Sequence, residues 1–387
     1  MNGPDKQHIM NTYARYDLTL VSGEGCRVTD DRGGTYLDFG AGIAVSALGH
    51  GHPRLAEALA EQAKKLIHIS NLYWNAPQAE LARKLAENSG LDRVFFCNSG
   101  AEAVEGAMKL ARRFGGARGR FEIIAMENSF HGRTFGAITA TGQKKYQKGL
   151  EPLLPGVKHA VFNDIDSLRA AITPQTAAVL LEPIQGESGI RPAGREYLAQ
   201  VARLCGDEGI LFIADEVQCG CGRTGALFAC QNYGVYPDVI VTAKGLAGGV
   251  PMGAILAREE VASAWGPGDH ASTFGGGPLA AAAANVVIDE LTGGVMENVR
   301  ANGAYLMKKL VSISEKYPVV KEIRGMGFML GMELDAPARE VVSRCMERGL
   351  LLIGAGERVL RFTPPLVAGA AEIDECAGIL SGVLEAL

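Results

Sequence analysis

The feature that most constrains this chain is a regular alternation of short apolar segments with helical segments through its central part. The apolar segments are bounded by turn residues and charged residues, which is typical of strands that are buried on both faces. We expect strands at Val94–Cys97, Glu122–Met126, Lys158–Phe162, Ala177–Glu182, Ile210–Ala214, Val239–Thr242 and Met252–Leu256. Strands that alternate with helices form a largely parallel sheet covered by helices. The sequence therefore predicts an α/β fold around a mostly parallel seven-stranded sheet.

The two ends of the chain follow a different pattern. The N-terminal part predicts a hairpin with strands at Gly25–Asp30 and Thr35–Asp38, then amphipathic helices at Pro53–Lys65 and Gln78–Glu87. After Gly275 we expect an α+β pattern of helices at Pro278–Leu291, Asn302–Lys316, Arg339–Arg348 and Glu372–Leu387, with strands at Val319–Arg324, Phe328–Leu334, Leu350–Ile353 and Val359–Phe362. We predict a large α/β domain at residues 49–274 and a small α+β domain formed by residues 1–48 and 275–387.

Composition narrows the class of protein. The 387 residues are 47% apolar and 21% charged, which is ordinary for a globular protein with sizeable cores. A net charge of −5 argues against a nucleic-acid partner. No apolar run approaches the roughly 20 residues of a membrane span, and the segment Met1–His8 has no signal-peptide core. We expect a cytoplasmic protein with neither a membrane nor a nucleic acid as partner.

The cysteines and one glycine-rich stretch exclude two further classes. Eight cysteines are spread through the chain, and the close pair Cys219 and Cys221 lacks the second pair of ligands that a zinc site needs, so we predict free thiols and no metal. The glycines of Gly220–Gly225 have the spacing of a dinucleotide fingerprint, but polar residues separate them from the strand and no acidic residue follows at the required distance.

Two charges stand at the ends of predicted neighbouring strands. Lys244 follows the apolar run Val239–Thr242, and Asp215 ends the run that begins at Ile210. Ligands of parallel α/β sheets bind beyond the carboxyl ends of the strands. A partly desolvated lysine can form an imine with a carbonyl, and an aspartate can hold a protonated pyridine nitrogen. The pair suggests pyridoxal phosphate, although each residue taken alone is equally typical of an ordinary strand end that faces water.

Two loops at the same predicted edge carry further candidates. Asn98–Glu102 opens a helix whose free amides could bind an anion, but Ser99 and Glu102 also have the spacing of a capping box that needs no ligand. The position on the same edge as Lys244 favours a phosphate. Ser129–Thr134 offers Phe130, which could stack on a flat ring or belong to the core, and Arg133, which could hold a carboxylate. Val217 would face the same side of its strand as Asp215 and could pack on the opposite face of that ring.

These residues belong to a set of motifs that appear in one order along the chain: Asn98-Ser-Gly-Ala-Glu-Ala103, Ser129-Phe-His-Gly-Arg-Thr134, Glu182-Pro-Ile-Gln-Gly-Glu187, Asp215-Glu-Val-Gln218, Gly222-Arg-Thr-Gly225, Ala243-Lys-Gly245, Ser272-Thr-Phe-Gly-Gly276 and Arg361-Phe-Thr-Pro-Pro365. From about Tyr13 to the C-terminus the chain resembles the class III (ornithine-type) pyridoxal-phosphate aminotransferases, and among them most closely the acetylornithine aminotransferases. The resemblance implies the fold of the aspartate-aminotransferase superfamily and a homodimer with shared active sites.

The resemblance also implies a role for each matching residue. Lys244 would be the Schiff-base lysine, Asp215 would hold the pyridine nitrogen, and Gln218 would lie near the ring hydroxyl. The ring would lie between Phe130 and Val217. The phosphate would be bound by Ser99, Gly100 and Ala101, and by Thr273 of the neighbouring subunit. Substrate carboxylates would be held by Arg133 and Arg361, with Glu182 as the partner of Arg361.

The implied reaction is a transamination in arginine biosynthesis. N-acetyl-L-ornithine would give its δ-amine to 2-oxoglutarate, and the products would be N-acetylglutamate 5-semialdehyde and glutamate. Aminotransferases for ornithine, 4-aminobutyrate or an N-succinyl amino acid share the same residues and remain alternatives. An aminomutase of the same fold and a non-catalytic ligand sensor are more distant alternatives.

Overall fold

The structure is a computed structural model and describes residues 8–387. The segment on which we predict no signal-peptide core falls mostly on residues 1–7, which lie outside the described residues.

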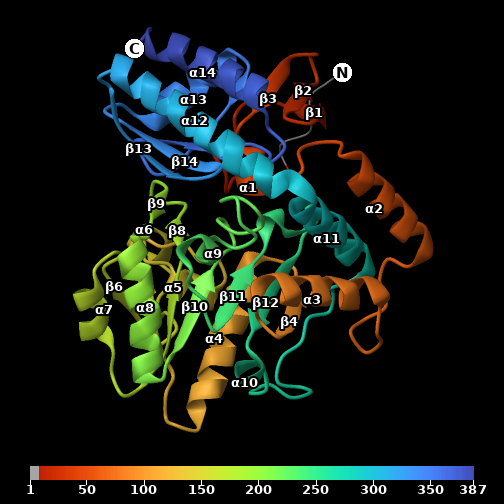
Figure 1. The fold of residues 1–387 in the computed structure, drawn as a ribbon, viewed down its shortest axis with the longest axis vertical. Coiled ribbons are helices and arrows are strands. Elements are labelled where there is room, and N and C mark those ends of the chain that lie inside the picture. Colours follow the sequence, from red (N-terminus) through yellow and green to blue (C-terminus); the bar gives the residue numbers. More distant parts are fainter. Residues whose placement is uncertain (1–7) are drawn as a thin grey trace.

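A seven-stranded sheet forms the lower half of the molecule (Figure 1). Its strand order is β4-β12-β11-β10-β7-β5-β6, and only β12 runs antiparallel to its neighbours within this sheet. The bounds are β4 (Arg93–Cys97), β5 (Glu122–Met126), β6 (Val157–Ala160), β7 (Thr176–Leu181), β10 (Leu211–Asp215), β11 (Val239–Thr242) and β12 (Gly253–Ala257). The predicted mostly parallel sheet of seven strands is confirmed.

Alternating side chains of this sheet enter two separate cores. On β10, for example, Leu211 and Ile213 pack with one cluster, while Phe212 and Ala214 pack with the other. The first face is covered by α4 (Gly100–Gly116) and α5 (Phe135–Ala140), and the second by α3 (Ala76–Ser89), α8 (Arg195–Glu208) and α11 (Pro278–Glu290). Helices on both faces explain why the strands read as continuous apolar runs without polar alternation.

The remaining elements of the lower half are short. They are α6 (Lys144–Gln147), α7 (Ile165–Ala171), α9 (Ala229–Tyr233), α10 (Glu259–Ala262), the 3₁₀ turn η1 (Lys244–Ala247) and the hairpin of β8 (Ile184–Gln185) with β9 (Arg191–Pro192).

Two four-stranded sheets form the upper half (Figure 1). One joins both chain ends in the order β1-β2-β3-β15, and the other has the order β13-β14-β17-β16. Their strands are β1 (Leu20–Glu24), β2 (Arg27–Asp30), β3 (Thr35–Asp38), β13 (Val320–Met326), β14 (Met329–Leu334), β15 (Leu350–Leu351), β16 (Ile353–Gly354) and β17 (Val359–Phe362). The single strand predicted at Leu350–Ile353 is wrong, because Leu352 divides it into two pieces that pair in different sheets. The domain boundaries at residues 48/49 and 274/275 remain a prediction.

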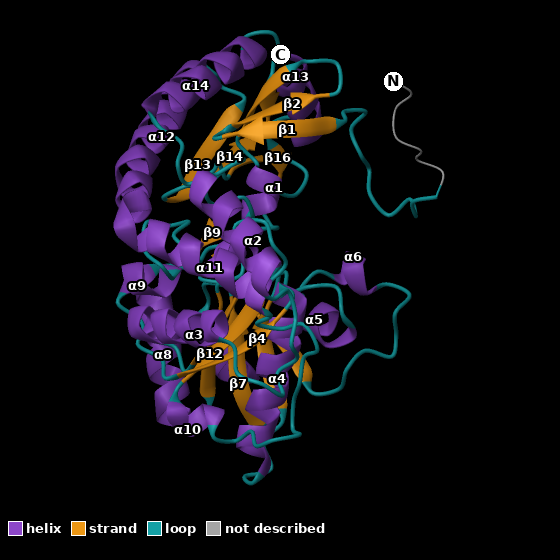
Figure 2. Cartoon of the chain, turned by 90° about the vertical axis from the view of Figure 1, so that its right-hand side faces the viewer, coloured by secondary structure: helices purple, strands orange, loops and turns teal. Residues whose placement is uncertain are grey.

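The longest helical stretch connects the lower and upper halves and is kinked at Gly294, where φ is +139°. α11 passes through a π-helical turn, η2 (Leu291–Val295), into α12 (Met296–Lys316), which extends the helix predicted to begin at Asn302. This helix runs along one side of the molecule, with α12 beside α14 (Figure 2). The other helices are α1 (Ala41–Ala44), α2 (Pro53–Lys65), α13 (Ala338–Glu347) and α14 (Ala370–Leu384).

The stretch Pro278–Lys316 has 39 residues and contains a window with a hydropathy of 1.3, so by length and composition alone it could cross a membrane. Its packing gives another reason for its apolar character. Ala281, Ala284, Val287 and Ile288 are buried in the main core, and α11 packs on α2 and α3.

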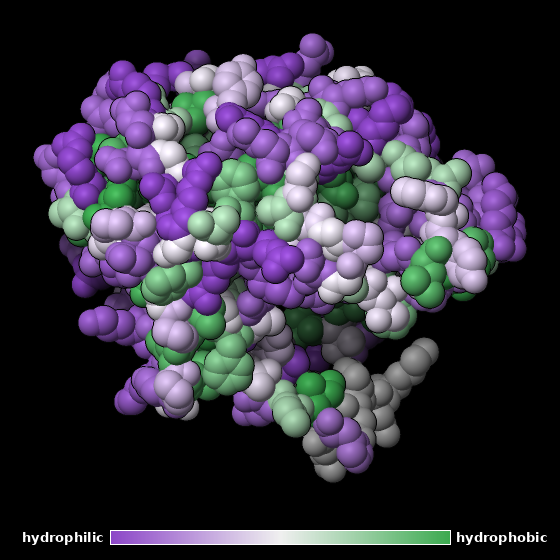
Figure 3. Space-filling model, turned by 90° about the horizontal axis from the view of Figure 1, so that it is seen from below, coloured by the Kyte–Doolittle hydropathy of each residue, from purple (hydrophilic) through white to green (hydrophobic). Residues whose placement is uncertain are grey.

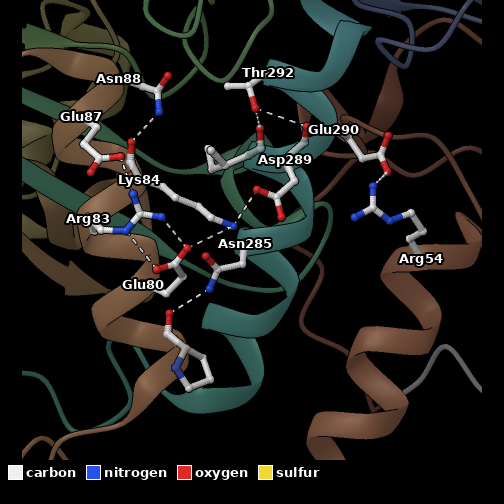
Figure 4. Close-up of polar contacts among 12 residues, drawn as sticks. Arg54, Glu80, Arg83, Lys84, Glu87, Asn88, Asn285, Asp289, Glu290 and Thr292 are labelled. Atoms are coloured by element: carbon white, nitrogen blue, oxygen red, sulfur yellow. Dashed lines mark hydrogen bonds and ion pairs between the residues drawn. The ribbon is translucent and has the colours of Figure 1, made fainter.

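Polar contacts fasten α11 to these two helices (Figure 4). Lys84 of α3 pairs with Asp289 at 2.6 Å, and the amide of Asn285 donates to the carbonyl of Pro77 at 2.8 Å. Arg54 of α2 pairs with Glu290 at 2.5 Å. Exposed ion pairs contribute at most about 1 kcal/mol each, so the buried apolar face supplies most of the stability of this packing. The outer face seen from below is mostly hydrophilic, with small scattered hydrophobic groups (Figure 3).

Candidate active site

A cavity of about 350 Å³ lies at the carboxyl edge of the large sheet. It brings together nine of the predicted site residues: Ser99, Gly100, Ala101, Phe130, Glu182, Asp215, Val217, Gln218 and Lys244. These residues follow or end β4, β5, β7, β10 and β11. Arg133, Arg361 and Thr273 are not among the residues that line this cavity.

Lys244 begins the turn that follows β11. Its backbone has a φ of +43°, a left-handed conformation that is rare for a residue with a side chain. Burial lowers the pKa of Lys244 from 10.5 to about 8, and nearby carboxylates offset part of this effect. A substantial fraction of the amine is therefore neutral, and hence nucleophilic, slightly above neutral pH.

Asp215 is held by two contacts at the end of β10. Its Oδ1 accepts a hydrogen bond from the amide of Val217 at 3.0 Å, and its Oδ2 lies 2.6 Å from Nδ1 of His131. Both side chains are buried. Burial acts to lower the pKa of His131, but the hydrogen bond and charge of Asp215 outweigh it and raise that pKa overall. His131 thus fixes the orientation of the Asp215 carboxylate at the cavity, where this carboxylate could hold a cationic ring nitrogen.

Glu182 follows β7 and is also buried. Its Oε1 accepts from the amide of Phe130 at 2.8 Å, and its Oε2 accepts from the amide of Gly186 at 3.1 Å. Burial raises the pKa of Glu182 to about 7, against the lowering effect of the His131 charge. Both oxygens are therefore engaged by the backbone, and this side chain connects two loops of the site.

The predicted pair of Glu182 with Arg361 is wrong. Nη1 of Arg361 instead lies 2.6 Å from Oε1 of Glu187 and donates to Oε1 of Gln218 at 3.0 Å. Arg361 is buried on β17, and its Nε has no hydrogen-bond partner among the described residues. Burial acts to raise the pKa of Glu187, but the charges of Arg361 and Lys244 lower it. The anion that faces Arg361 is thus Glu187.

The start of α4 has the features of an anion site. Oγ of Ser99 accepts from the amide of Glu102 at 3.2 Å, but the Glu102 carboxylate accepts from the amide of Asn98 at 2.8 Å instead of returning to Ser99. The capping box is therefore only half formed. Helix geometry leaves the first amides, including those of Gly100 and Ala101, without intrahelical partners. A Cβ on Gly100 would lie 2.7 Å from Val217, so glycine is needed beside this cavity wall.

Arg133 is exposed and lies next to the cavity. Its guanidinium lies over the ring of Tyr146 at 4.1 Å and over the ring of Phe130 at 5.5 Å. Thr273 is exposed in a second cavity of about 630 Å³. Residues from the segments 70–79 and 267–275 contribute to the lining of this cavity. The predicted roles of both residues therefore require a ligand or a second chain.

Sequence reasoning assigned no role to His131 or Glu187. Both stood inside quoted motifs, His131 beside Phe130 and Glu187 at the end of the motif that begins with Glu182. The signal that could have found them was a polar side chain close to a predicted site residue. The sequence could not identify their partners, because Asp215 lies 84 residues from His131 and Arg361 lies 174 residues from Glu187.

The donor set fits pyridoxal phosphate and shows no grouping for a metal. Within residues 8–387, no three His, Cys, Asp or Glu side chains are grouped to hold a metal ion. All eight cysteines are free thiols and buried. A buried amine at Lys244, a buried carboxyl group at Asp215, free amides at a helix start and an aromatic ring at Phe130 match the aldehyde, ring nitrogen, phosphate and flat ring of this cofactor.

A sheet of this topology with a buried lysine and an aspartate at its carboxyl edge defines a pyridoxal-phosphate enzyme of the aspartate-aminotransferase superfamily. Residues 10–384 match the family described as aminotransferase class-III. The chain belongs to the class-III aminotransferases, which are enzymes that depend on pyridoxal phosphate.

Relatives support this assignment over nearly the whole chain. An acetylornithine aminotransferase of Caldanaerobacter subterraneus subsp. tengcongensis is 53% identical, covering 98% of both chains. One from Clostridium acetobutylicum is 48% identical, covering 97% of this chain and 98% of that one. Among solved structures, ornithine aminotransferase of Toxoplasma gondii has a TM-score of 0.95 at 33% identity, with 99% of this chain and 93% of that chain covered. N-acetylornithine aminotransferase of Stenotrophomonas maltophilia has a TM-score of 0.85 at 38% identity, with 97% of each chain covered.

The burial of Lys244 predicts a measurable cost in stability. A lysine with a folded pKa of about 8 and an unfolded pKa of 10.5 destabilises the fold below pH 8, and this cost disappears as the pH rises through 10.5. At about 1.4 kcal/mol per pKa unit, Lys244→Met should stabilise the cofactor-free protein by ~3 kcal/mol at pH 7 and by much less at pH 10. Urea unfolding of both proteins at the two pH values measures the difference. A gain that does not change with pH would contradict the low pKa.

Proposed function

We propose that this chain transfers the δ-amino group of N-acetyl-L-ornithine to 2-oxoglutarate in arginine biosynthesis in the cytoplasm. The products are N-acetylglutamate 5-semialdehyde and glutamate. The observation that carries this proposal is the ion pair of the buried Arg361 with the partly exposed Glu187 beside the cavity of Lys244. The names of the acetylornithine aminotransferases that are similar over nearly their full length support the choice of donor.

We assign the cofactor to the residues that line the cavity. Ser99, Gly100 and Ala101 would hold the phosphate, Lys244 the aldehyde carbon, and Asp215 the ring nitrogen. Phe130 and Val217 would contact the two faces of the ring. When bound, pyridoxal phosphate accepts the electrons that are released as the substrate carbon loses its proton.

The chain's own residues bind the substrates and move protons. Lys244, with its lowered pKa, would take the proton from the reacting carbon of the substrate on its Nζ and would pass it on to the bound cofactor within the same half-reaction. Asp215 would contact the ring nitrogen and stabilise a positive charge there, and its contact with His131 at 2.6 Å holds the carboxylate in place. Arg133 holds the carboxylate distant from the reacting amine, which acetylornithine, glutamate and 2-oxoglutarate all carry. Gln218 lines the cavity and donates to Glu187 at 3.2 Å, and it would lie near the ring hydroxyl of the cofactor.

The pair of Arg361 and Glu187 resolves a conflict between the two substrates. Glutamate has a carboxylate on the carbon that carries its reacting amine, whereas acetylornithine has only hydrogen there. Arg361 would bind the carboxylate of glutamate, and it would be left without an anion when acetylornithine binds. An unpartnered buried cation costs roughly 3–5 kcal/mol. Glu187 would neutralise Arg361 for acetylornithine and move aside for glutamate.

We further propose a homodimer with shared active sites and a large and a small domain divided at residues 48/49 and 274/275. Large apolar side chains are exposed around the second cavity: Leu72 at 86%, Tyr73 at 66%, Trp74 at 94% and Phe274 at 66%. Exposed apolar groups of this size mark interaction sites. Thr273 lies beside them, which suits the proposed contact with the phosphate of the partner subunit.

A panel of amino donors with 2-oxoglutarate tests the substrate. We expect kcat/KM for acetylornithine to exceed those for ornithine, 4-aminobutyrate and N-succinylornithine by roughly tenfold or more, which is the discrimination that a shaped pocket supplies. Turnover without any acceptor would instead indicate an aminomutase. A preference for another donor would overturn the substrate and leave the aminotransferase intact.

Substitution of Glu187 tests the proposed movement of its carboxylate towards and away from Arg361, which we call the gate. Glu187→Gln removes the anion that neutralises Arg361, so the half-reaction with acetylornithine should slow on the order of a hundredfold, equivalent to ~2.7 kcal/mol. The half-reaction with glutamate should be retained or become faster. Single-turnover spectra measure both. As a control, Glu182→Gln removes one of the two oxygens that accept from the amides of Phe130 and Gly186, and it should affect both half-reactions equally. Equal losses in Glu187→Gln would refute the gate.

Substitution of Thr273 tests the shared site. Thr273→Ala should weaken retention of the cofactor by ~1.5–3 kcal/mol, the value of a hydrogen bond to a charged group. Equilibrium dialysis at several protein concentrations measures this, and dilution should release cofactor as dimers dissociate. Thr292→Ala, an exposed threonine outside both cavities, is the control. A monomer with full activity would contradict the proposal.

A further inference from the structure

The hairpin of β8 and β9 carries Glu187 and lies directly beneath the sheet of β13 and β14 (Figure 1). One row of that sheet faces the hairpin. Arg324 of β13 stands opposite Gly331 of β14, and Gly331 stands opposite Arg361 of β17. Residues directly opposite one another in neighbouring strands point to the same face of a sheet. The two arginines therefore flank a glycine on one face.

The turn of the hairpin lies over this glycine. A Cβ on Gly331 would lie 2.9 Å from Cβ of Ile190 and 3.2 Å from the carbonyl oxygen of Gly189. On one side, Nε of Arg324 donates to the carbonyls of Gly189 at 2.9 Å and Ile190 at 3.1 Å. On the other side, Arg361 binds the carboxylate of Glu187. The row of Arg324, Gly331 and Arg361 thus forms the surface of the sheet on which the hairpin turn packs, and we call this row the seat of the turn.

Arg324 is itself firmly fixed. Its side chain is 9% exposed, and its Nη1 pairs with Glu322 at 2.5 Å and with Glu333 at 2.6 Å. Its Nη2 is buried without a hydrogen-bond partner in the described part of the chain. A buried guanidinium that leaves one nitrogen unpartnered is not optimised for stability alone.

The turn has a conformation that needs this support. Ile190 has a φ of +54°, a left-handed conformation that is a genuine outlier for a β-branched residue. Gly189 has a φ of +107°, and a Cβ there would lie 3.0 Å from Nη2 of Arg324. Such conformations persist only where surrounding contacts impose them, and they gather at functional sites.

We infer that Arg324 is a positioning residue that holds the turn on its seat, so that the Glu187 carboxylate faces Arg361 when the donor carries no carboxylate on its reacting carbon. This inference rests on the proposed gate. Within the described residues, the hydrogen-bond and ion-pair partners of Arg324 do not line the cavity, so Arg324 acts through the backbone of Gly189 and Ile190. Without it, the turn would relax and Glu187 would lose its alignment with Arg361.

The test compares half-reactions of the holoenzyme. Arg324→Gln should slow the half-reaction with acetylornithine roughly tenfold and leave that with glutamate within about twofold, because glutamate displaces Glu187 in any case. Gly331→Ala disturbs the seat without changing a charge and should shift the ratio of the two rates in the same direction. Glu322→Gln removes an exposed partner of Arg324 and should leave the ratio unchanged.

A double substitution separates positioning from general damage. In the Glu187→Gln background, Arg324→Gln should change the ratio no further, since the carboxylate that it aligns is gone. Equal losses in both half-reactions, or an additional shift in the double variant, would overturn the inference. If Glu187→Gln itself leaves the wild-type ratio unchanged, the gate fails and the inference with it. If Glu187→Gln shifts the ratio while neither Arg324→Gln nor Gly331→Ala does, only the inference fails.

Discussion

The site depends on keeping the amine of Lys244 out of water at the end of a buried strand. Below pH 8 the charged form of this buried amine opposes folding. Nearby carboxylates have to offset part of the cost of burying its charge. The carboxylates of Glu187, Glu182 and Asp215 act to raise the pKa of Lys244, while the charge of Arg361 acts with burial to lower it. Near pH 8 the charged and neutral forms of the Lys244 amine therefore have similar free energies. This suits a group that must both give and take a proton.

The sheet brings these groups to one place through the direction of its strands. Parallel strands end at the same edge, so loops after β4, β5, β7, β10 and β11 meet there. The antiparallel strand β12 enters the sheet from that edge, and the residues before it, Gly249 to Met252, complete the cavity wall. Gly253 makes this possible, because a Cβ there would lie 2.4 Å from the carbonyl oxygen of Ser99. Helices on both faces of the sheet leave this edge as the region where a ligand can approach.

The sequence was sufficient to predict the features that depend only on neighbouring residues in the chain. Strand ends at Asp215 and Lys244 followed from apolar runs bounded by charge, and the cavity contains both. Contacts between distant segments were not predictable in this way. The partner of Arg361 is chosen by a hairpin turn 174 residues earlier, and the division of Leu350–Ile353 is imposed by β3 and β17, which pair with its two halves. The sequence around Arg361 is compatible with either Glu182 or Glu187 as its partner, and the sequence of Leu350–Ile353 is compatible with either one strand or two.

The contacts of the two glutamates explain why Glu187, and not Glu182, suits the movable role. Both oxygens of Glu182 accept backbone amides, so a rotation would leave the amides of Phe130 and Gly186 without partners. Each buried amide without a partner costs about 1–3 kcal/mol. The carboxylate of Glu187 contacts side chains, those of Arg361 and Gln218, and it is 23% exposed. It can therefore move while the backbone stays satisfied. Glu182 has the opposite role, because it stays fixed. It accepts from the amide of Phe130, in the loop that would stack on the cofactor, and from the amide of Gly186, at the base of the hairpin that carries Glu187. The fixed carboxylate of Glu182 thereby determines the position from which the carboxylate of Glu187 moves.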